Sequence, residues 1–412
     1  MANANLKHAK KQKNDEFYTQ YQDIQKEVNA YLEYDKEVFR GKTILLPCDD
    51  PEWSNFTKFF AQNFENFGIK KLISTSFAVE SKNIEIDYEP SLFESIDPRF
   101  DKTKTRCKGK IFTLAQDENH DGKINIDDLK WNYLEGDGDF RSDEVKKLRD
   151  EADIIITNPP FSLFREFVAW IMEAHKKFLI IGNMNAIGCK EIFPLIKENK
   201  MWLDKPFVRG AGYFTSPLEL NKNLSYFNSH DYREGFIRVP GVRWFTNLEH
   251  GRRHQPLQLM TMNDNIKFSK HKEVQGIGYQ KYDNYDAIEV PFTDAIPSDY
   301  DGVMGVPISF LDKYCPEQFE ILGSTQRGCH DSVPDTKKYD DYWEVKPNGE
   351  KTGSSGGKTN ENPNIARNNG KQNYFINKDG HTVQSLYTRI FIKKKSLDFS
   401  NLRGNKYKGI NE

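Results

Sequence analysis

Residues 154–161 read IIITNPPF and constrain the fold of this chain more than any other segment. Three consecutive isoleucines are typical of a buried strand, because β-branched side chains pack well on a pleated sheet. Pro159 and Pro160 end this strand, since proline offers no N–H to a sheet ladder or to a helix. Helical spacing of apolar residues resumes over 162–174. The segment therefore predicts a strand, a stiff turn and a helix, with the turn where open α/β sheets bind ligands.

The polar groups of this turn suit a planar amino group. The carboxamide oxygen of Asn158 and the carbonyl of Pro159 are acceptors that have no proton to lose. If both accept hydrogens from an exocyclic amino group, such as N6 of adenine, the nitrogen moves toward tetrahedral geometry and its lone pair can attack an electrophile. Phe161 offers a ring on which an extruded base can stack. The alternative is a tight turn that caps a buried strand, with Phe161 in the core.

Further segments occur in an order that is typical of one family. They are DEFYTQ at 15–20, CDDPEWSNF at 48–56, GDGDFRS at 136–142, FLIIGN at 178–183 and EVPFTDAIPSDYDGVMGVPISFLDKY at 289–314. Together with TNPPFSLFREF at 157–167, they resemble the EcoRI-type adenine-specific DNA methyltransferases, which use S-adenosylmethionine. The resemblance implies that Asn158, Pro159, Pro160 and Phe161 form the catalytic turn.

The same resemblance implies a binding pocket for S-adenosylmethionine. Its residues would be Phe17, Tyr18, Thr19, Gln20, Asp49, Asp50, Pro51, Asp139 and Phe140. The first four would hold the methionine carboxylate through backbone and hydroxyl groups, and the Asp-Asp-Pro segment would meet the ammonium group. The last two would accept from the adenine amino group and stack on its ring. Alternatively, the first segment is an aromatic patch that packs a helix, and GDGDF is a solvated turn.

Two departures from the family pattern concern this pocket. The glycine-rich loop usual after the first strand is replaced by EWSN at 52–55. The acidic residue usual after the second strand, here KLISTSF at 71–77, is missing, so that Ser74, Ser76 or Glu80 would have to bind the ribose hydroxyls. The cofactor assignment therefore depends on the set of motifs rather than on one contact.

Composition narrows the class of protein. With 412 residues, of which 37% are hydrophobic and 29% charged, the chain can form two domains with sizeable cores. We find no apolar run long enough to cross a bilayer and expect no membrane association. The five cysteines are odd in number and lack metal-ligand spacing, which argues against a disulfide framework and a metal site and favours the cytoplasm.

The net charge of −2 does not by itself indicate a nucleic-acid-binding protein, so the distribution of charge matters more. Basic residues gather near the amino terminus, near residue 252 and in the carboxyl-terminal tail. The candidates for contacts with DNA phosphates are Arg252, Arg253, Lys393, Lys394 and Lys395. The alternative is a set of solvated surface charges.

Alternating strand-like and helix-like segments up to residue 250 predict the fold class. TILLP, KLIST, DIIIT and FLIIGN are each followed by helical spacing, which predicts an α/β domain with a mainly parallel sheet and helices on both faces. By resemblance this is a Rossmann-like class I methyltransferase sheet. GFIRV and VRWFTNL, joined through Pro240 and Gly241, predict a closing hairpin.

The chain is expected to divide near residue 250. Residues 1–250 would form the catalytic domain, and 251–412 a smaller mixed α/β domain for target recognition. Residues 325–375 are rich in Gly, Asn, Lys, Asp and Ser, a composition from which no core is expected. This insertion is either disordered or a loop that orders against DNA.

Residues 117–128, DENHDGKINIDD, have the spacing of a calcium-binding loop. However, the preceding KGKIFTLAQ is strand-like, and the last position carries Asp instead of the longer Glu. A polar turn between a strand and a helix at 126–134 explains the same residues.

The resemblance implies methylation of adenine N6 in a short sequence of double-stranded DNA, after the base is flipped out. The protein would then belong to a restriction–modification system or be an orphan modification enzyme. Whether a separate restriction endonuclease is its partner is left open by the sequence. A single chain with both functions can act as a monomer.

Three alternatives remain. The first is methylation of another amino group, since the turn also suits RNA adenine, cytosine N4 or a protein glutamine. The second is an inactive DNA-binding relative, with which the altered EWSN loop is compatible. A nuclease is the third, although NPPF has no role in phosphodiester hydrolysis.

Overall fold

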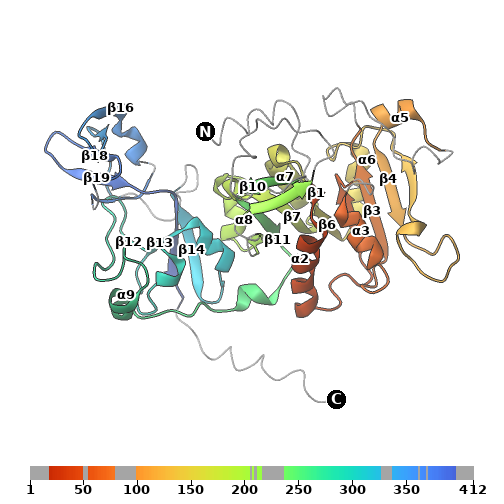
Figure 1. Ribbon diagram of the computed structural model, residues 1–412, viewed down its shortest axis with the longest axis horizontal. Helices are drawn as coiled ribbons and strands as arrows, with labels where there is room; N and C mark the ends of the chain where they lie inside the picture. The colour runs from red at the N-terminus through yellow and green to blue at the C-terminus, as the bar shows by residue number, and fades with distance from the viewer. Residues whose placement is uncertain are drawn as a thin grey trace, which may run out of the picture. The chain divides into compact units, whose positions relative to one another are not determined.

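The protein is a mixed α/β structure with four sheets among the residues that the structure describes (Figure 1). The computed structural model describes residues 18–49, 54–78, 99–204, 207, 211–215, 236–325, 336–360, 362–367 and 370–395. The chain forms two compact units, one of residues 1–187 and 200–251, the other of 188–199 and 252–412. No helix within the described ranges is both long and apolar enough to cross a membrane.

An eight-stranded sheet is the framework of the first unit. Its order is β5 (Lys130–Tyr133), β4 (Lys110–Leu114), β3 (Lys71–Ser76), β2 (Thr43–Pro47), β6 (Ile154–Thr157), β7 (Lys177–Asn183), β11 (Val242–Thr246) and β8 (Trp202–Leu203). The central strands β3, β2, β6 and β7 run parallel, and the other pairs are antiparallel. β2, β6 and most of β7 are buried, which explains their continuous apolar sequences. The four strands predicted from the sequence are therefore the core of this sheet.

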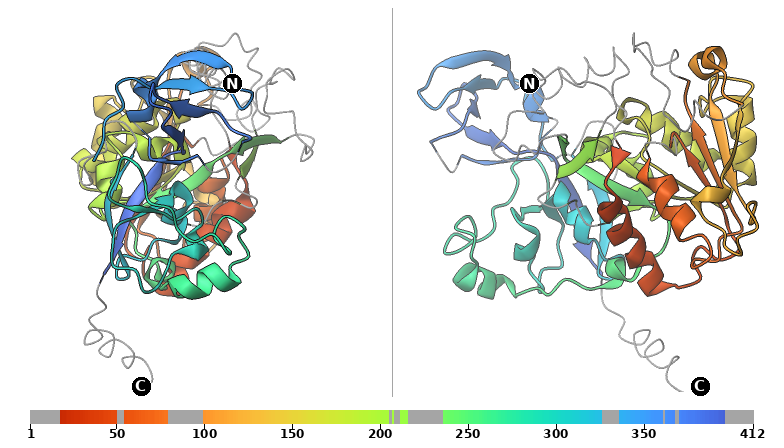
Figure 2. Two further views of the ribbon diagram at one scale, coloured as in Figure 1. Left: turned by 90° about the vertical axis from the view of Figure 1, so that its left-hand side faces the viewer. Right: turned by 45° about the vertical axis from the view of Figure 1, so that its right-hand side comes forward.

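Helices of the first unit follow the strands in the chain (Figures 1 and 2). They are α2 (Tyr21–Tyr34), α3 (Asn55–Gln62), α5 (Lys102–Cys107), α6 (Asp143–Glu151) and α7 (Phe164–Glu173). Ile44 and Leu46 of β2 pack in one cluster with buried residues of α2 and α3. In α7, residues Phe167, Trp170 and Ile171 are buried, as the helical spacing predicted.

A small three-stranded sheet contains β1 (Tyr18–Thr19), β9 (Ala211–Thr215) and β10 (Ile237–Pro240). The predicted hairpin between β10 and β11 is wrong. The two strands meet at Gly241, which has φ +73°, but β10 pairs with β9, whereas β11 pairs with β7 and β8. Val242 and Phe245 are fully buried in the large sheet, so burial of β11 beside β7 outweighs local pairing.

The GDGDF segment lies directly on the end of β3. Ala78 N–H donates to the Asp137 carbonyl at 2.8 Å, and Gly138 has φ +84°. A Cβ at Gly138 would lie 2.3 Å from the Ser76 carbonyl oxygen, which is backbone and cannot move aside freely. Glycine is therefore required here both for conformation and for space.

We expect Gly138→Ala to lower the free energy of unfolding by more than about 2 kcal/mol, because a left-handed conformation and a backbone clash add up. Gly122→Ala is the matched control, since Gly122 has φ +85° but no neighbour within 4 Å of its Cβ position. Chemical denaturation measures both. Equal losses in the two variants would contradict the close approach to Ser76.

Residues 117–128 lie between β4 and β5, and the last three of them form a short 3₁₀ helix, η2 (Ile126–Asp128). The predicted helix at 126–134 is therefore wrong beyond the first turn. Asp128 is buried and its carboxylate accepts from the N–H groups of Asn125, Glu118 and Asn119, which lowers its pKa. Within the described ranges, no group of three or more His, Cys, Asp or Glu residues is placed to hold a metal ion.

The second unit contains two sheets and two described α-helices. A four-stranded sheet has the order β12 (Ile288–Glu289), β13 (Met304–Pro307), β20 (Arg389–Lys394) and β14 (Phe319–Ser324). A five-stranded sheet has the order β16 (Lys351–Ser355), β15 (Trp343–Val345), β18 (Tyr374–Ile376), β19 (Thr382–Ser385) and β17 (Asn364–Ala366). The helices are α8 (Phe193–Lys197) and α9 (Met262–Phe268).

The five-stranded sheet corrects the expectation that residues 325–375 form no core. Four buried residues make a small cluster, namely Tyr339, Tyr342, Phe375 and Val383. Residues 326–335 lie outside the described part of the chain. The prediction failed because it counted apolar residues, whereas this sheet also uses tyrosine rings and polar side chains.

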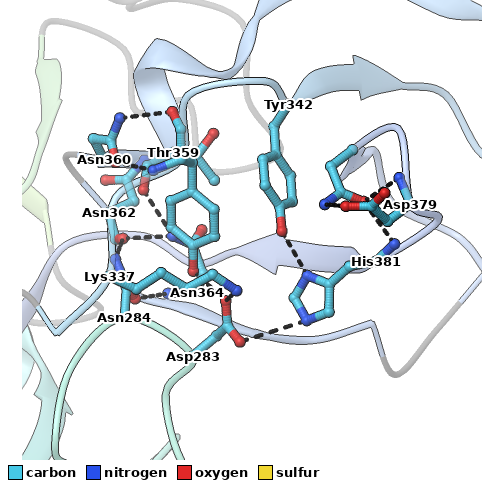
Figure 3. Close-up of polar contacts among 12 residues, drawn as sticks. Asp283, Asn284, Lys337, Tyr342, Thr359, Asn360, Asn362, Asn364, Asp379 and His381 are labelled. Carbon is cyan, nitrogen blue, oxygen red and sulfur yellow. Dashed lines mark hydrogen bonds and ion pairs between the residues drawn. The ribbon is translucent and has the colours of Figure 1, made fainter.

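A polar network fastens this sheet to the turn at residues 283 and 284 (Figure 3). The Asp283 carboxylate accepts from Tyr339 Oη at 2.6 Å and from Lys337 Nζ at 3.0 Å, and His381 Nε2 lies 3.5 Å away. The side chain of Asn284 donates to the Asn362 carbonyl and accepts from Asn364 N–H. These contacts satisfy polar groups that would be costly to bury unpaired.

We expect Asp283→Asn to lower stability at neutral pH by about 1 kcal/mol, the scale of a charged hydrogen bond at a partly buried site. Partial burial raises the pKa of the Asp283 carboxyl, but hydrogen bonds from Tyr339 and Lys337 outweigh it and leave the pKa below its usual value. Such a group stabilises the fold above its unfolded pKa of about 3.9, and this contribution is lost as the pH falls through the folded pKa.

Thermal unfolding between pH 3 and pH 7 tests this expectation. The difference between the wild type and Asp283→Asn should be largest at pH 7 and shrink below about pH 4. A difference that is constant across this range would show that the charge of Asp283 contributes nothing.

Candidate active site

The Asn-Pro-Pro-Phe turn follows β6 directly and is stiff. Asn158 is half-buried, Pro159 is buried, and Pro160 precedes the 3₁₀ helix η3 (Phe161–Leu163), which continues into α7. Leu163 N–H donates to the Pro160 carbonyl at 2.9 Å. The strand, turn and helix predicted from the sequence are therefore confirmed.

Phe161 connects this turn to the amino-terminal motif. Its partly buried ring packs on the core and meets Phe214 of β9 edge-on, with the centroids 6.4 Å apart. Phe214 in turn stands opposite Thr19 in the pairing of β9 with β1. Asn55 Nδ2, in the first turn of α3, donates to the Thr19 carbonyl at 2.8 Å. The structure thus brings two motifs together that are more than a hundred residues apart in sequence.

Thr19 and Gln20 carry buried hydrogen-bond donors at this place. Thr19 is 2% exposed, and neither its Oγ1 nor the Nε2 of Gln20 has a hydrogen-bond partner among the described residues. Buried polar atoms without partners cost free energy, so they indicate a group that binds there. A hydroxyl and an amide N–H can both donate to a carboxylate, which fits the carboxylate of a methionine-containing cofactor. Tyr18 is buried, and Phe17 lies outside the described residues.

Asp49 lies just beyond the carboxyl end of β2 and is held by hydroxyl groups. Cys48 before it has φ +75°, a conformation that is uncommon for a residue with a side chain. Asp49 is 2% exposed, and its carboxylate accepts from Ser54 Oγ at 2.6 Å and from Thr157 Oγ1 at 2.5 Å. Asp50 and Pro51 lie outside the described residues.

The backbone of Asp49 is held by the neighbouring strand and helix. Its N–H donates to the Thr75 carbonyl at 2.9 Å, and its carbonyl accepts from the hydroxyls of Thr57 and Ser74. The Ser74 hydroxyl is therefore used inside the protein and not available to a ribose. Ser76 Oγ is buried and accepts from Lys110 N–H at 3.3 Å, and Glu80 lies outside the described residues.

Asp139 and Phe140 both contact other residues of the protein. The Asp139 carboxylate accepts from Arg141 through Nε at 2.9 Å and Nη2 at 2.6 Å, and this contact raises the pKa of Arg141. Phe140 is 4% exposed, and its ring packs edge-on against Phe167 and Trp170. The Arg141 guanidinium lies over the same ring, 5.5 Å from its centroid, so Phe140 already packs against three residues of the protein.

Of the basic candidates near residue 252, Arg253 is only 8% exposed, and its Nη2 donates to Asn199 Oδ1 at 2.9 Å. Such a guanidinium supports the fold and is poorly placed to meet a phosphate. Arg252 is half-buried in the same turn, η7 (Gly251–His254).

The three lysines of the tail also differ from one another. Lys394 Nζ donates to the Ser298 carbonyl, and Lys395 Nζ to the Pro316 carbonyl at 2.8 Å. Lys393 is exposed on β20, opposite Glu320 of β14. Of the three, Lys393 is therefore the one best placed to meet a phosphate.

Sequence reasoning missed the hydroxyl network around Asp49. Ser54, Thr57 and Thr157 are all buried. The only signal was small polar residues next to apolar strands, which is common in loops and helix starts. Ser54 and Thr157 reach the Asp49 carboxylate, and Thr57 reaches its carbonyl. The contact of Thr157 comes from the pairing of β2 with β6, which are distant in the chain.

A family model described as adenine-specific methyltransferase EcoRI matches residues 5–395. The chain is 42% identical to Type II methyltransferase M.EcoRI of Escherichia coli over 319 residues. This aligned region covers 77% of this chain and 88% of that protein. It is 34% identical over 323 residues to Type II methyltransferase M.MpnI of Mycoplasma pneumoniae, covering 76% and 83% respectively. No solved structure gives a significant match. Since the family model spans nearly the whole chain, the protein belongs to the EcoRI family of adenine-specific methyltransferases.

Proposed function

We propose that this protein is a site-specific DNA methyltransferase that transfers a methyl group to N6 of adenine. The observation that carries the proposal is the Asn158–Phe161 turn at the carboxyl end of a central parallel strand, in a chain of this family. The parallel centre of the eight-stranded sheet, with the motifs at its carboxyl edge, supports a Rossmann-like class I methyltransferase domain.

The catalytic turn acts on a flipped-out adenine. Asn158 Oδ1 and the Pro159 carbonyl accept the two N6 hydrogens, and this pyramidalises the nitrogen and frees its lone pair. Phe161 supports the base by stacking. The turn is fixed by β6 and η3 before the base arrives, so little reorganisation is needed during the reaction.

The methyl donor of the family is of the S-adenosylmethionine type, which supplies an activated methyl group when it is bound. Thr19 and Gln20 would donate hydrogen bonds to its carboxylate, since both carry buried donors without a partner among the described residues. Asp49 would attract its ammonium group. The GDGDF loop, fixed on β3 through Gly138, would border the adenine of the cofactor, with Asp139 accepting from its amino group and Phe140 stacking on its ring, as the resemblance implies.

Recognition of double-stranded DNA would be the task of the second unit. Lys and Arg outnumber Asp and Glu over residues 336–395, which favours contact with phosphates. Arg252 and Lys393 remain the candidates among the basic residues singled out from the sequence. The proposal includes action as a monomer, since catalysis and target recognition lie in one chain. It also includes a restriction endonuclease that acts as a separate protein.

The first test is single-molecule sequencing of DNA from cells that express the wild type or Asn158→Ala. A short motif that carries N6-methyladenine only with the wild type is the expected result. Absence of any new mark with soluble protein would overturn the proposal. Transfer of radiolabel to RNA or protein would then identify a methyltransferase with another substrate. Failure to bind S-adenosylmethionine would identify an inactive relative.

We expect Asn158→Ala to lower kcat at least about 100-fold, the scale of removing one positioned polar group from an active site. Cofactor affinity, measured by calorimetry, should stay within about twofold of the wild type, because Asn158 contacts the base and not the cofactor. A near-normal kcat in this variant would contradict the mechanism.

We expect Thr19→Val to weaken cofactor binding about tenfold, which corresponds to one hydrogen bond to a charged group. The fold should be unaffected, since the hydroxyl has no partner among the described residues. Thr246→Val is the control, because Thr246 is equally buried but its hydroxyl donates to the Phe178 carbonyl. Unchanged affinity in Thr19→Val would remove Thr19 from the site.

A further inference from the structure

Thr157 connects the catalytic turn to Asp49. It is the last residue of β6, is fully buried, and directly precedes Asn158. Its hydroxyl oxygen lies 2.5 Å from both Asp49 Oδ2 and the Pro47 carbonyl oxygen. One side chain thus joins the end of β6 to the end of β2.

The backbone ladder does not make this connection. The pairing of β2 with β6 comprises Ile44 with Ile154 and Leu45 with Ile155, and it stops there. Both strands continue for two more residues toward the catalytic edge. On its other side β6 pairs with β7 as far as Thr157, which stands opposite Ile180, so a contact beyond the ladder is needed only on the β2 side, where twisted strands diverge. The Thr157 hydroxyl supplies this contact.

Asp49 is itself a fixed partner. Ser54 Oγ donates to its Oδ1 at 2.6 Å and accepts from Phe56 N–H at 3.1 Å, so the carboxylate is tied to the first turn of α3. The carbonyl of Asp49 accepts from Thr57 and Ser74. A hydrogen bond to such a group transmits position, since neither the carboxylate nor its backbone can move without breaking other bonds.

We propose that Thr157 is a positioning residue that sets the place of Asn158 relative to the cofactor-binding edge. Its one hydroxyl hydrogen, shared between the Asp49 carboxylate and the Pro47 carbonyl, holds the end of β6 against the end of β2, and the following peptide then fixes the acceptor groups of Asn158 and Pro159. Asp49 therefore serves the reaction through Thr157 and Ser54 in addition to any direct contact with the cofactor. The inference rests on the proposed function and extends it to a residue outside the NPPF motif.

The test compares Thr157→Val, which keeps the shape and removes the hydroxyl, with Thr157→Ser, which keeps the hydroxyl. Thr246→Val is the matched control, because Thr246 is also fully buried and its hydroxyl donates to the Phe178 carbonyl at 2.7 Å. The measurements are kcat with saturating DNA and cofactor, cofactor affinity by calorimetry, and the melting temperature of each full-length variant.

We expect Thr157→Val to lower kcat about 10- to 100-fold, because a displacement of about 1 Å in a catalytic group has effects of this size. Cofactor affinity should change less than about threefold, and Thr157→Ser should restore most of kcat. Thr246→Val should lose a similar amount of thermal stability while it retains kcat. This split between rate and stability distinguishes positioning from general support of the fold.

An unchanged kcat in Thr157→Val, or an equal loss of kcat in Thr246→Val, would overturn the inference. Failure of Thr157→Ser to restore the rate would overturn it too. If Thr157→Val does not fold, Thr157→Cys, which replaces the hydroxyl with a thiol that is only a weak donor, should give the same loss of kcat at normal cofactor affinity, and a normal kcat would overturn the inference. Methylation by the wild type and its loss in Asn158→Ala test the proposed function separately.

Discussion

The hydrogen bonds around the Asp49 carboxylate hold the ends of three elements at one edge of the large sheet. A carboxylate that is 2% exposed is costly unless polar groups replace water, and here hydroxyls from α3 and β6 do so. The same bonds keep β2 and β6 together beyond their backbone pairing. The stability of the sheet edge and the geometry of the Asn158–Phe161 turn therefore depend on one set of contacts.

Local sequence patterns predicted the central strands and the helix after NPPF because their residues are buried on both sides or along one face. The hydroxyl network has no periodic pattern, since its members come from separate segments that only the sheet brings together. Charge patterns were weaker guides. Arg253 and two tail lysines donate to acceptors within the protein, and sequence alone does not separate such residues from exposed ones.

The five-stranded sheet shows a second limit of prediction from composition. Its core contains few apolar residues, and polar side chains such as Asp283 and Asn284 complete it through specific hydrogen bonds. Hydrogen bonds of this kind depend on exact partners. A count of apolar residues cannot detect them, so composition predicts no core for this segment.

The second unit is built from two separate stretches of chain, because residues 188–199 belong to it although residues on both sides of them belong to the first unit. α8 of this segment packs against β14, and Asn199 accepts from Arg253. A gene fragment that starts at residue 252 would therefore lack part of its own framework. An exchange of this whole unit needs residues 188–199 as well as residues 252–412, so a single breakpoint in the gene cannot transfer it intact.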